Sequence, residues 1–102
     1  MGAPSKAKRP KRRWVGIRTT EEIDRENLKS IIDQIMPSSS AKLYDLKIVN
    51  GQNLAIVRIN LTEYPVFVFK CQSDNRLHTI TASGKIRLVR DRLGLPKPKL
   101  RR

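Results

Sequence analysis

The chain has 102 residues, a length that fits one small domain and leaves no room for separate cofactor and substrate domains. Its 22 Lys and Arg against 9 Asp and Glu give a formal net charge of +13. No apolar run approaches the ~20 residues of a membrane-spanning helix, no apolar segment follows the basic start as in a secretory signal, and a single cysteine excludes an internal disulfide. We therefore expect a cytoplasmic protein without a membrane partner.

The excess charge lies at the two ends of the chain. Residues 1–13 carry six positive charges and no acid, residues 14–83 carry eight charges of each sign, and residues 84–102 carry eight positive charges and one acid. Basic ends around a neutral middle are typical of proteins that bind a polyanion. We expect nucleic acid as the partner, with a solubility or targeting tail as the plainer alternative.

The first predicted elements are a tail and a strand. Residues 1–11 hold Pro, Gly, Ser and cations with almost nothing apolar, so we expect a disordered basic tail. The alternation of apolar residues in RRWVGIRTT, residues 12–20, predicts a strand. Its two faces carry Trp14, Gly16 and Arg18 on one side and Val15 and Ile17 on the other.

Residues 23–36 are predicted to form a helix. An apolar stripe at helical spacing runs along it, formed by Leu28, Ile31, Ile32 and Ile35. Asp24 is a suitable N-cap, because its carboxylate can accept bonds from free backbone N–H groups, and Ile23 before it can pack against Leu28. Pro37 and the serines that follow it end the helix.

Residues 42–60 are predicted to form a β-hairpin, because Asn50-Gly51 supplies the positive φ angles of a tight turn. Pairing across a two-residue turn places these side chains on the core face: Tyr44, Leu46, Ile48, Ala55, Val57 and Ile59. Leu54 and Ile56 then share the opposite face with charged side chains. Two aliphatic residues in that position indicate an interface with a partner protein.

The segment of residues 61–75 allows two interpretations. Thr62 as an N-cap and Pro65 in the first turn favour a helix, whereas the run of Val and Phe at residues 66–69 has strand propensity. Cys71 follows this run, so we expect it to be a small buried hydrophobic residue rather than a reactive thiol.

The C-terminal part is predicted to be a strand followed by a basic helix. β-branched side chains within residues 76–83 favour the strand. The helix is expected to begin at Ser83-Gly84 and to end at Gly94. Its apolar face consists of Ile86, Val89 and Leu93. Residues 95–102 are a basic tail interrupted by prolines.

The sequence contains no recognisable catalytic or metal-binding pattern. The one histidine, His78, lies in a strand pattern, where a structural role is more common than general-base catalysis. Cys and His pairs at metal-ligand spacing are missing, as is a glycine-rich phosphate loop. The acids at residues 21–26 lie at a helix start, where the helix dipole favours them. If the protein takes part in an enzyme, we expect another molecule to supply the chemistry.

The chemistry that remains is anion recognition. At Ser83-Gly84 the backbone N–H groups of a helix start can hold a phosphate, and Gly84 lets a nucleic-acid backbone approach. The candidate RNA-binding residues are Arg12, Arg13, Trp14, Arg18, Ser83, Gly84, Lys85, Arg87, Arg90 and Arg92. First and last strands are commonly neighbours in such sandwiches, so we expect these two groups to merge. A merely capped and solvated helix is the alternative.

The order of these elements resembles that of one family, archaeal ribonuclease P protein component 2. The matching residues are Arg13-Trp14-Val15 in the first strand, Arg58 in the hairpin and Ser83-Gly84-Lys85-Ile86-Arg87 before the basic helix. The similarity covers residues 12–94, and it rests on the order and spacing of short motifs. Members of the family carry a longer helix in the stretch between Leu61 and Arg76, so the chain departs from the family there.

The resemblance implies a two-layer α+β sandwich of ferredoxin-like topology, with helices on one face of a mostly antiparallel sheet and a basic C-terminal helix. It favours a helix from about Glu63 to Gln72. It also implies a non-catalytic protein subunit of ribonuclease P, which binds the ribonuclease P RNA and pairs with the component 3 protein. In that complex the RNA removes the 5′ leader from precursor tRNA, and we expect Mg²⁺ with the RNA and no cofactor on the chain itself.

Three functions follow as hypotheses from the sequence. The first is the RNA-binding subunit of ribonuclease P, and the second is a small basic ribosomal protein. The RNA that co-purifies with the chain separates these two. The third is a stand-alone nuclease, which the lack of a catalytic cluster argues against and which purified protein without RNA would test.

Overall fold

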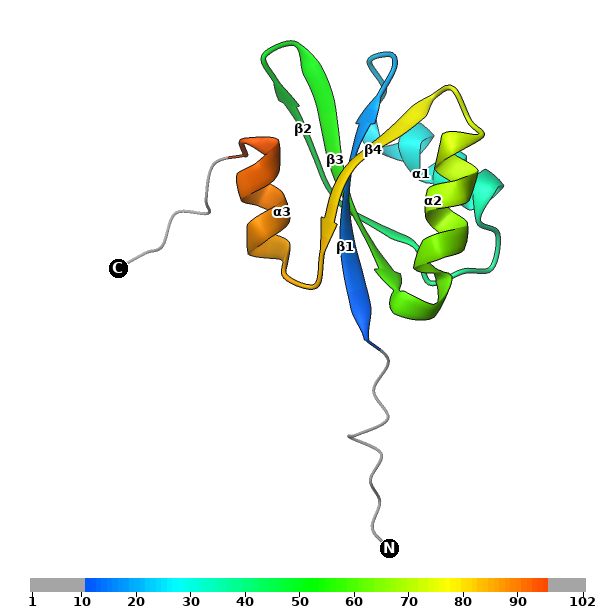
Figure 1. Ribbon diagram of the computed structural model, residues 1–102. Coiled ribbons are helices and arrows are strands. Elements are labelled where there is room, and N and C mark those ends of the chain that lie inside the picture. The colour runs from blue at the N-terminus through cyan, green and yellow to red at the C-terminus, as the bar shows by residue number, and fades with distance from the viewer. Residues whose placement is uncertain (1–10, 96–102) are drawn as a thin grey trace, which may run out of the picture.

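The structure, a computed structural model, describes residues 11–95, and within them four strands form one antiparallel sheet on which three α-helices pack (Figure 1). In chain order the elements are β1 (Arg12–Thr19), α1 (Arg25–Ile35), β2 (Lys42–Val49), β3 (Gln52–Asn60), the 3-10 helix η2 (Leu61–Glu63), α2 (Tyr64–Gln72), β4 (Leu77–Ser83) and α3 (Ile86–Leu93). The predicted basic tails, residues 1–11 and 95–102, lie outside the described residues except for Lys11 and Leu95.

The sheet has the strand order β2-β3-β1-β4, and each neighbouring pair is antiparallel. Along the chain the elements run strand, helix, two strands, helix, strand, which is the ferredoxin-like arrangement of an α+β sandwich. The predicted fold class is therefore confirmed. β1 lies between β3 and β4, so the first and last strands are neighbours, as expected.

α1 and α2 cover one face of the sheet (Figure 1). β1 alternates as predicted, and its side chains Val15 and Ile17 are buried on this face. α1 begins after Asp24, whose carboxylate accepts a hydrogen bond of 2.9 Å from the backbone N–H of Asn27. The core here is formed by Leu28, Ile31 and Ile32 of α1, Leu43, Ala55, Val57, Ile59 and Leu77 of the sheet, and Phe67 and Cys71 of α2.

The segment that allowed two interpretations is helical. η2 leads directly into α2, so the helix expected from about Glu63 to Gln72 is confirmed. Pro65 lies in the first turn, as expected, but Thr62 is not the N-cap, because the residue that precedes the helix is Glu63. Burial raises the pKa of the Cys71 thiol to about 12, which agrees with the expected buried, unreactive cysteine.

α3 covers part of the opposite face of the sheet (Figure 1). Leu54 and Ile56 of β3 lie beneath it, with 4% and 0% of their surface exposed. The helix supplies Val89 and Leu93 to this second cluster, and Leu95 completes it. The interpretation of Leu54 and Ile56 as an interface for a partner protein is therefore corrected, because a helix of the same chain covers both side chains.

α3 can lie close to the sheet because β1 carries a glycine where the helix crosses it. A Cβ atom on Gly16 would meet the Cδ2 atom of Leu93 at 3.0 Å, so even a methyl group would press on the helix. The helix ends at Gly94, whose φ of 76° lies in the left-handed region that favours glycine. The predicted end of this helix is thus confirmed.

β2 departs from the expected register at Tyr44. The ladder shifts between Leu43 and Asp45, so Tyr44 is the extra residue of a β-bulge. As a result Leu43 faces the core beneath α1 and α2, while Tyr44 lies against Trp14 on the α3 face. The expectation that Tyr44 and Ile48 fill the core is wrong, since 48% of Tyr44 and 61% of Ile48 are exposed.

Candidate nucleic-acid interface

One row of side chains crosses the four strands of the sheet on its α3 face. Lys42 on β2 pairs with Arg58 on β3. Trp14 on β1 pairs with Arg58 on one side and with Ser83 of β4 on the other. Directly paired residues point to the same face of a sheet, with Cβ atoms about 5 Å apart. This cross-strand row therefore runs from the β2 edge of the sheet to the start of α3.

The chain passes from β4 to α3 through Ser83, Gly84 and Lys85. The Ser83 hydroxyl accepts a hydrogen bond of 3.1 Å from the backbone N–H of Lys85, which closes a tight turn. The helix begins at Ile86 rather than at Ser83-Gly84, and its N-cap residue is Lys85. A lysine side chain carries donors alone, so it cannot cap the N–H groups of the first helical turn. Those N–H groups can donate hydrogen bonds to an external acceptor such as a phosphate.

Arg13 reaches this joint from β1. Its Nη1 atom lies 3.0 Å from the position that a Cβ atom on Gly84 would occupy. The guanidinium group can approach so closely because Gly84, in the turn after β4, has no side chain. The basic start of β1 and the basic start of α3 therefore merge, as predicted. We call the combined set the basic surface, and its members are Arg12, Arg13, Lys42, Arg58, Lys85 and Arg87.

Two predicted RNA-binding residues of α3 attach the helix to its own sheet. Arg90 forms an ion pair of 2.9 Å with Asp45 of β2. Arg92 donates hydrogen bonds to the Thr81 hydroxyl at 3.0 Å and to a β4 carbonyl at 3.2 Å. A third predicted residue, Arg18, lies at the far end of β1 and lines a hollow there. Arg90 and Arg92 therefore hold α3 on the sheet, and Arg18 lies away from the Ser83-Gly84 joint.

We expect Arg90→Ala to destabilise the protein and Arg87→Ala to leave its stability unchanged. The side chains of Arg90 and Asp45 are 19% and 18% exposed, so loss of the arginine leaves a mostly desolvated carboxylate without its partner. The cost should be about 2 kcal/mol, between the values for surface and fully buried pairs. Arg87 is exposed on the same helix and serves as the matched control. Urea unfolding measures the stability of both variants, and equal midpoints for the two would contradict the structural role of Arg90.

Three residues at or beside this surface are not among the predicted RNA-binding residues, namely Lys42, Tyr44 and Arg58. The ring centroids of Trp14 and Tyr44 are 4.8 Å apart at an interplanar angle of 74°, an edge-to-face contact. The Arg58 guanidinium carbon lies 6.0 Å from the centroid of the Trp14 ring, within reach of a cation–π interaction. Without the bulge Lys42 would pair with Ile59 on the other face. The strand register therefore determines which side chains form this surface, and no local sequence pattern indicates the bulge.

Two carboxylates on adjoining segments are already engaged. Asp45 is held by Arg90, as described above. Glu63 accepts hydrogen bonds from the Ser40 hydroxyl and, at 2.9 Å, from the Ser40 backbone N–H. These bonds, with the side-chain bond as the larger cause, lower the pKa of Glu63. The acids on β2 and η2 near the basic surface are therefore paired, whereas Asp91 on α3 is an exposed acid.

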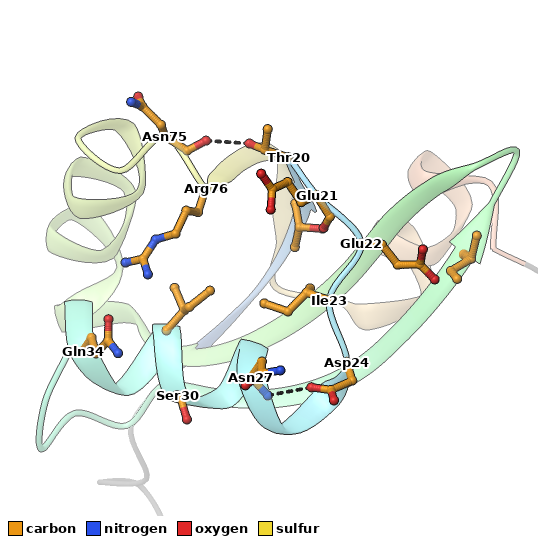
Figure 2. A pocket seen from close by; sticks show the side chains of 13 residues that line it. Thr20, Glu21, Glu22, Ile23, Asp24, Asn27, Ser30, Gln34, Asn75 and Arg76 are labelled. Atoms are coloured by element: carbon orange, nitrogen blue, oxygen red, sulfur yellow. Dashed lines mark hydrogen bonds between the residues drawn. The ribbon is translucent and has the colours of Figure 1, made fainter.

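A hollow of about 1030 Å³ lies at the other end of the sheet, between α1, the loop after β1 and the turn before β4 (Figure 2). Glu21, Glu22 and Asp24 give it an acidic lining. Asp24 caps α1, and Arg76 is paired with Asp74 at 2.7 Å. Asp24 and Arg76 thus have structural partners, and the acidic loop would repel a phosphate backbone. The two ends of the sheet therefore differ in charge.

The other tests of function can be stated briefly. Within residues 11–95, no group of three or more His, Cys, Asp and Glu side chains could hold a metal ion. None of the helices in that part of the chain is long and apolar enough to cross a membrane. No model of a known protein family matches the chain, and no curated protein matches it. The function must therefore be argued from the basic surface.

Proposed function

We propose that this protein is an RNA-binding subunit of ribonuclease P that assists the catalytic RNA in removing the 5′ leader from precursor tRNA. The observation that carries the proposal is the basic surface, to which β1, β2, β3 and the start of α3 contribute cations around one Ser-Gly joint. The resemblance to component 2 of ribonuclease P supports it, because the motif residues include four members of this surface, Arg13, Arg58, Lys85 and Arg87.

In this role the basic surface stabilises a folded RNA rather than reacting with it. Phosphates repel one another where RNA strands meet, and Lys and Arg side chains replace the counterions that screen this repulsion. The N–H groups at the start of α3 add donors with fixed directions, and Gly84 leaves room for a backbone. Such contacts position an RNA without reading its sequence.

The proposed complex is cytoplasmic and has ribonuclease P RNA, the component 3 protein and precursor tRNA as its other members. The Mg²⁺ needed for cleavage is assigned to the RNA in this proposal. Since Leu54 and Ile56 are buried beneath α3, the contact with component 3 requires a different surface of the chain.

RNA binding by the full chain tests the proposal. We expect tighter binding to the catalytic domain of ribonuclease P RNA than to a ribosomal RNA fragment of equal length at the same salt concentration. The reverse preference would replace the proposal by its alternative, a small basic ribosomal protein. Cleavage of precursor tRNA by the purified chain without RNA would show instead that the chain is a nuclease.

We expect Gly84→Val to weaken RNA binding by about 1–3 kcal/mol, the scale of a lost charge-assisted hydrogen bond. Its effect on stability should be small, because the added Cβ atom meets the flexible end of Arg13 and the φ angle of Gly84 lies outside the left-handed region. Ser83→Ala is the matched control. It removes the bond to the Lys85 N–H at a cost of about 1 kcal/mol in stability, with a smaller effect on binding. A Gly84→Val protein with wild-type RNA affinity would contradict the proposed phosphate site.

A further inference from the structure

Part of the sheet surface on the α3 side is not used for packing the helix. α3 covers the half that carries Gly16, Leu54 and Ile56. The half nearer the start of β1 carries Trp14 and Tyr44 instead, and Trp14 is only partly buried against the α3 cluster. The chain has five aromatic residues of the Phe, Trp and Tyr types, and two of them meet at this place.

Tyr44 is exposed here because of the β2 bulge. The extra residue turns its ring away from the core and onto the face that Trp14 occupies. Close to half of the tyrosine surface, 48%, remains in contact with solvent. Packing in the core therefore does not explain this bulge, because the bulge leaves the large Tyr44 ring exposed. Bulges commonly orient side chains toward functional sites.

The surroundings of the two rings are cationic. Arg58 lies over the Trp14 ring, Lys42 is its ladder partner on β2, and Arg12 is two residues before Trp14 on β1. Lys42 and Arg12 are exposed. A second copy of the chain would present the same positive charges, so self-association through this face is disfavoured. Exposed aromatic side chains between cations are complementary to a ligand that has a flat ring attached to phosphates.

We propose that Tyr44, held edge-to-face against Trp14, forms a stacking platform for a base of a single-stranded RNA segment, with Arg12, Lys42 and Arg58 contacting the flanking phosphates. The inference rests on the proposed function, since it specifies which part of an RNA binds to this surface. Bases in duplex RNA are stacked on one another and paired, so they cannot lie on a protein ring, whereas unpaired bases can. The start of α3 contacts phosphates in either kind of RNA.

The test uses the full-length chain and two RNAs of equal length, a single-stranded oligonucleotide and a duplex, at one salt concentration. Trp14 is the only tryptophan of the chain, so its fluorescence reports on the platform directly. We expect the single strand to quench this fluorescence in a saturable way and the duplex to leave it nearly unchanged. Tyr44→Ala should weaken single-strand binding roughly 5- to 150-fold, the range for loss of one stacked base, and should not change duplex binding. Tyr44→Phe should retain the wild-type affinity.

Two variants serve as controls. Phe69 is also a highly exposed aromatic residue, at 64%, but it lies on α2 in the opposite layer, so Phe69→Ala should bind both RNAs normally. Arg87→Ala should weaken binding to both RNAs by the same factor. Equal affinity of Tyr44→Ala and wild type for the single strand would overturn the platform alone, as would dimerisation of the chain through Tyr44. Failure of the wild-type chain to bind either RNA would overturn the proposed function as well.

Discussion

Replacement of Ile56 by aspartate is expected to unfold the protein. Ile56 has 0% of its surface exposed, and it lies between β3 and α3 in the cluster that holds the helix on the sheet. A carboxylate at this position would be buried without a hydrogen-bond partner or would have to displace α3. The cost should be roughly 4 kcal/mol or more, which is most of the stability of a small domain.

Ile48→Asp is the matched control for this prediction. The residue type is the same and the position lies on the neighbouring strand β2, but 61% of the side chain is exposed. We expect a change of about 0.5 kcal/mol or less, as is usual for surface positions. Circular dichroism during urea unfolding measures both variants. A folded Ile56→Asp protein with native stability would show that α3 does not pack on this face.

Removal of residues 1–10 is expected to lower both the RNA affinity and its salt dependence. This segment carries Lys6, Lys8 and Arg9 and no acid. The deletion stops before Lys11, because the Lys11 carbonyl accepts a hydrogen bond of 2.7 Å from the backbone N–H of Leu61. Three lost phosphate contacts should lower the slope of log affinity against log salt by about 2 to 3, and affinity should fall at least roughly tenfold.

The melting temperature should stay nearly unchanged by this deletion, since the segment contains almost no apolar side chains for a core. A full-length variant with Ser at Lys6, Lys8 and Arg9 separates charge from chain length, and it should behave like the deletion. Isothermal titrations at several salt concentrations provide the slopes. A slope equal to that of the wild-type chain would show that these charges do not meet phosphates.

The local elements of the fold could be predicted because their signals lie within a few residues of one another. α1 shows an N-cap at Asp24 and an apolar stripe at helical spacing, and β1 places Val15 and Ile17, two residues apart, on the core face. The end of α3 follows from the left-handed conformation that Gly94 adopts. The position of Arg13 near the joint at Gly84 could also be predicted from the sequence, because β1 and β4 are the first and last strands of a compact sheet.

Features that depend on tertiary structure could not be predicted in the same way. Leu54 and Ile56 suggested an open interface, because no local pattern says that a helix thirty residues later folds over them. The position of Tyr44 depends on a one-residue shift in the β2 ladder, and such a shift moves side chains to the other face. Arg90 could be recognised as structural only after Asp45 was placed beside it.

Cleavage of precursor tRNA by ribonuclease P RNA tests the central claim most directly. The reaction is measured over a range of Mg²⁺ concentrations with the RNA and component 3, with and without this chain, and with the Gly84→Val variant. We expect the wild-type chain to lower the Mg²⁺ concentration needed for half-maximal cleavage, because its cations replace counterions of the RNA, and we expect Gly84→Val to do so less well at equal protein concentration. An unchanged Mg²⁺ requirement with saturating wild-type chain would contradict the account.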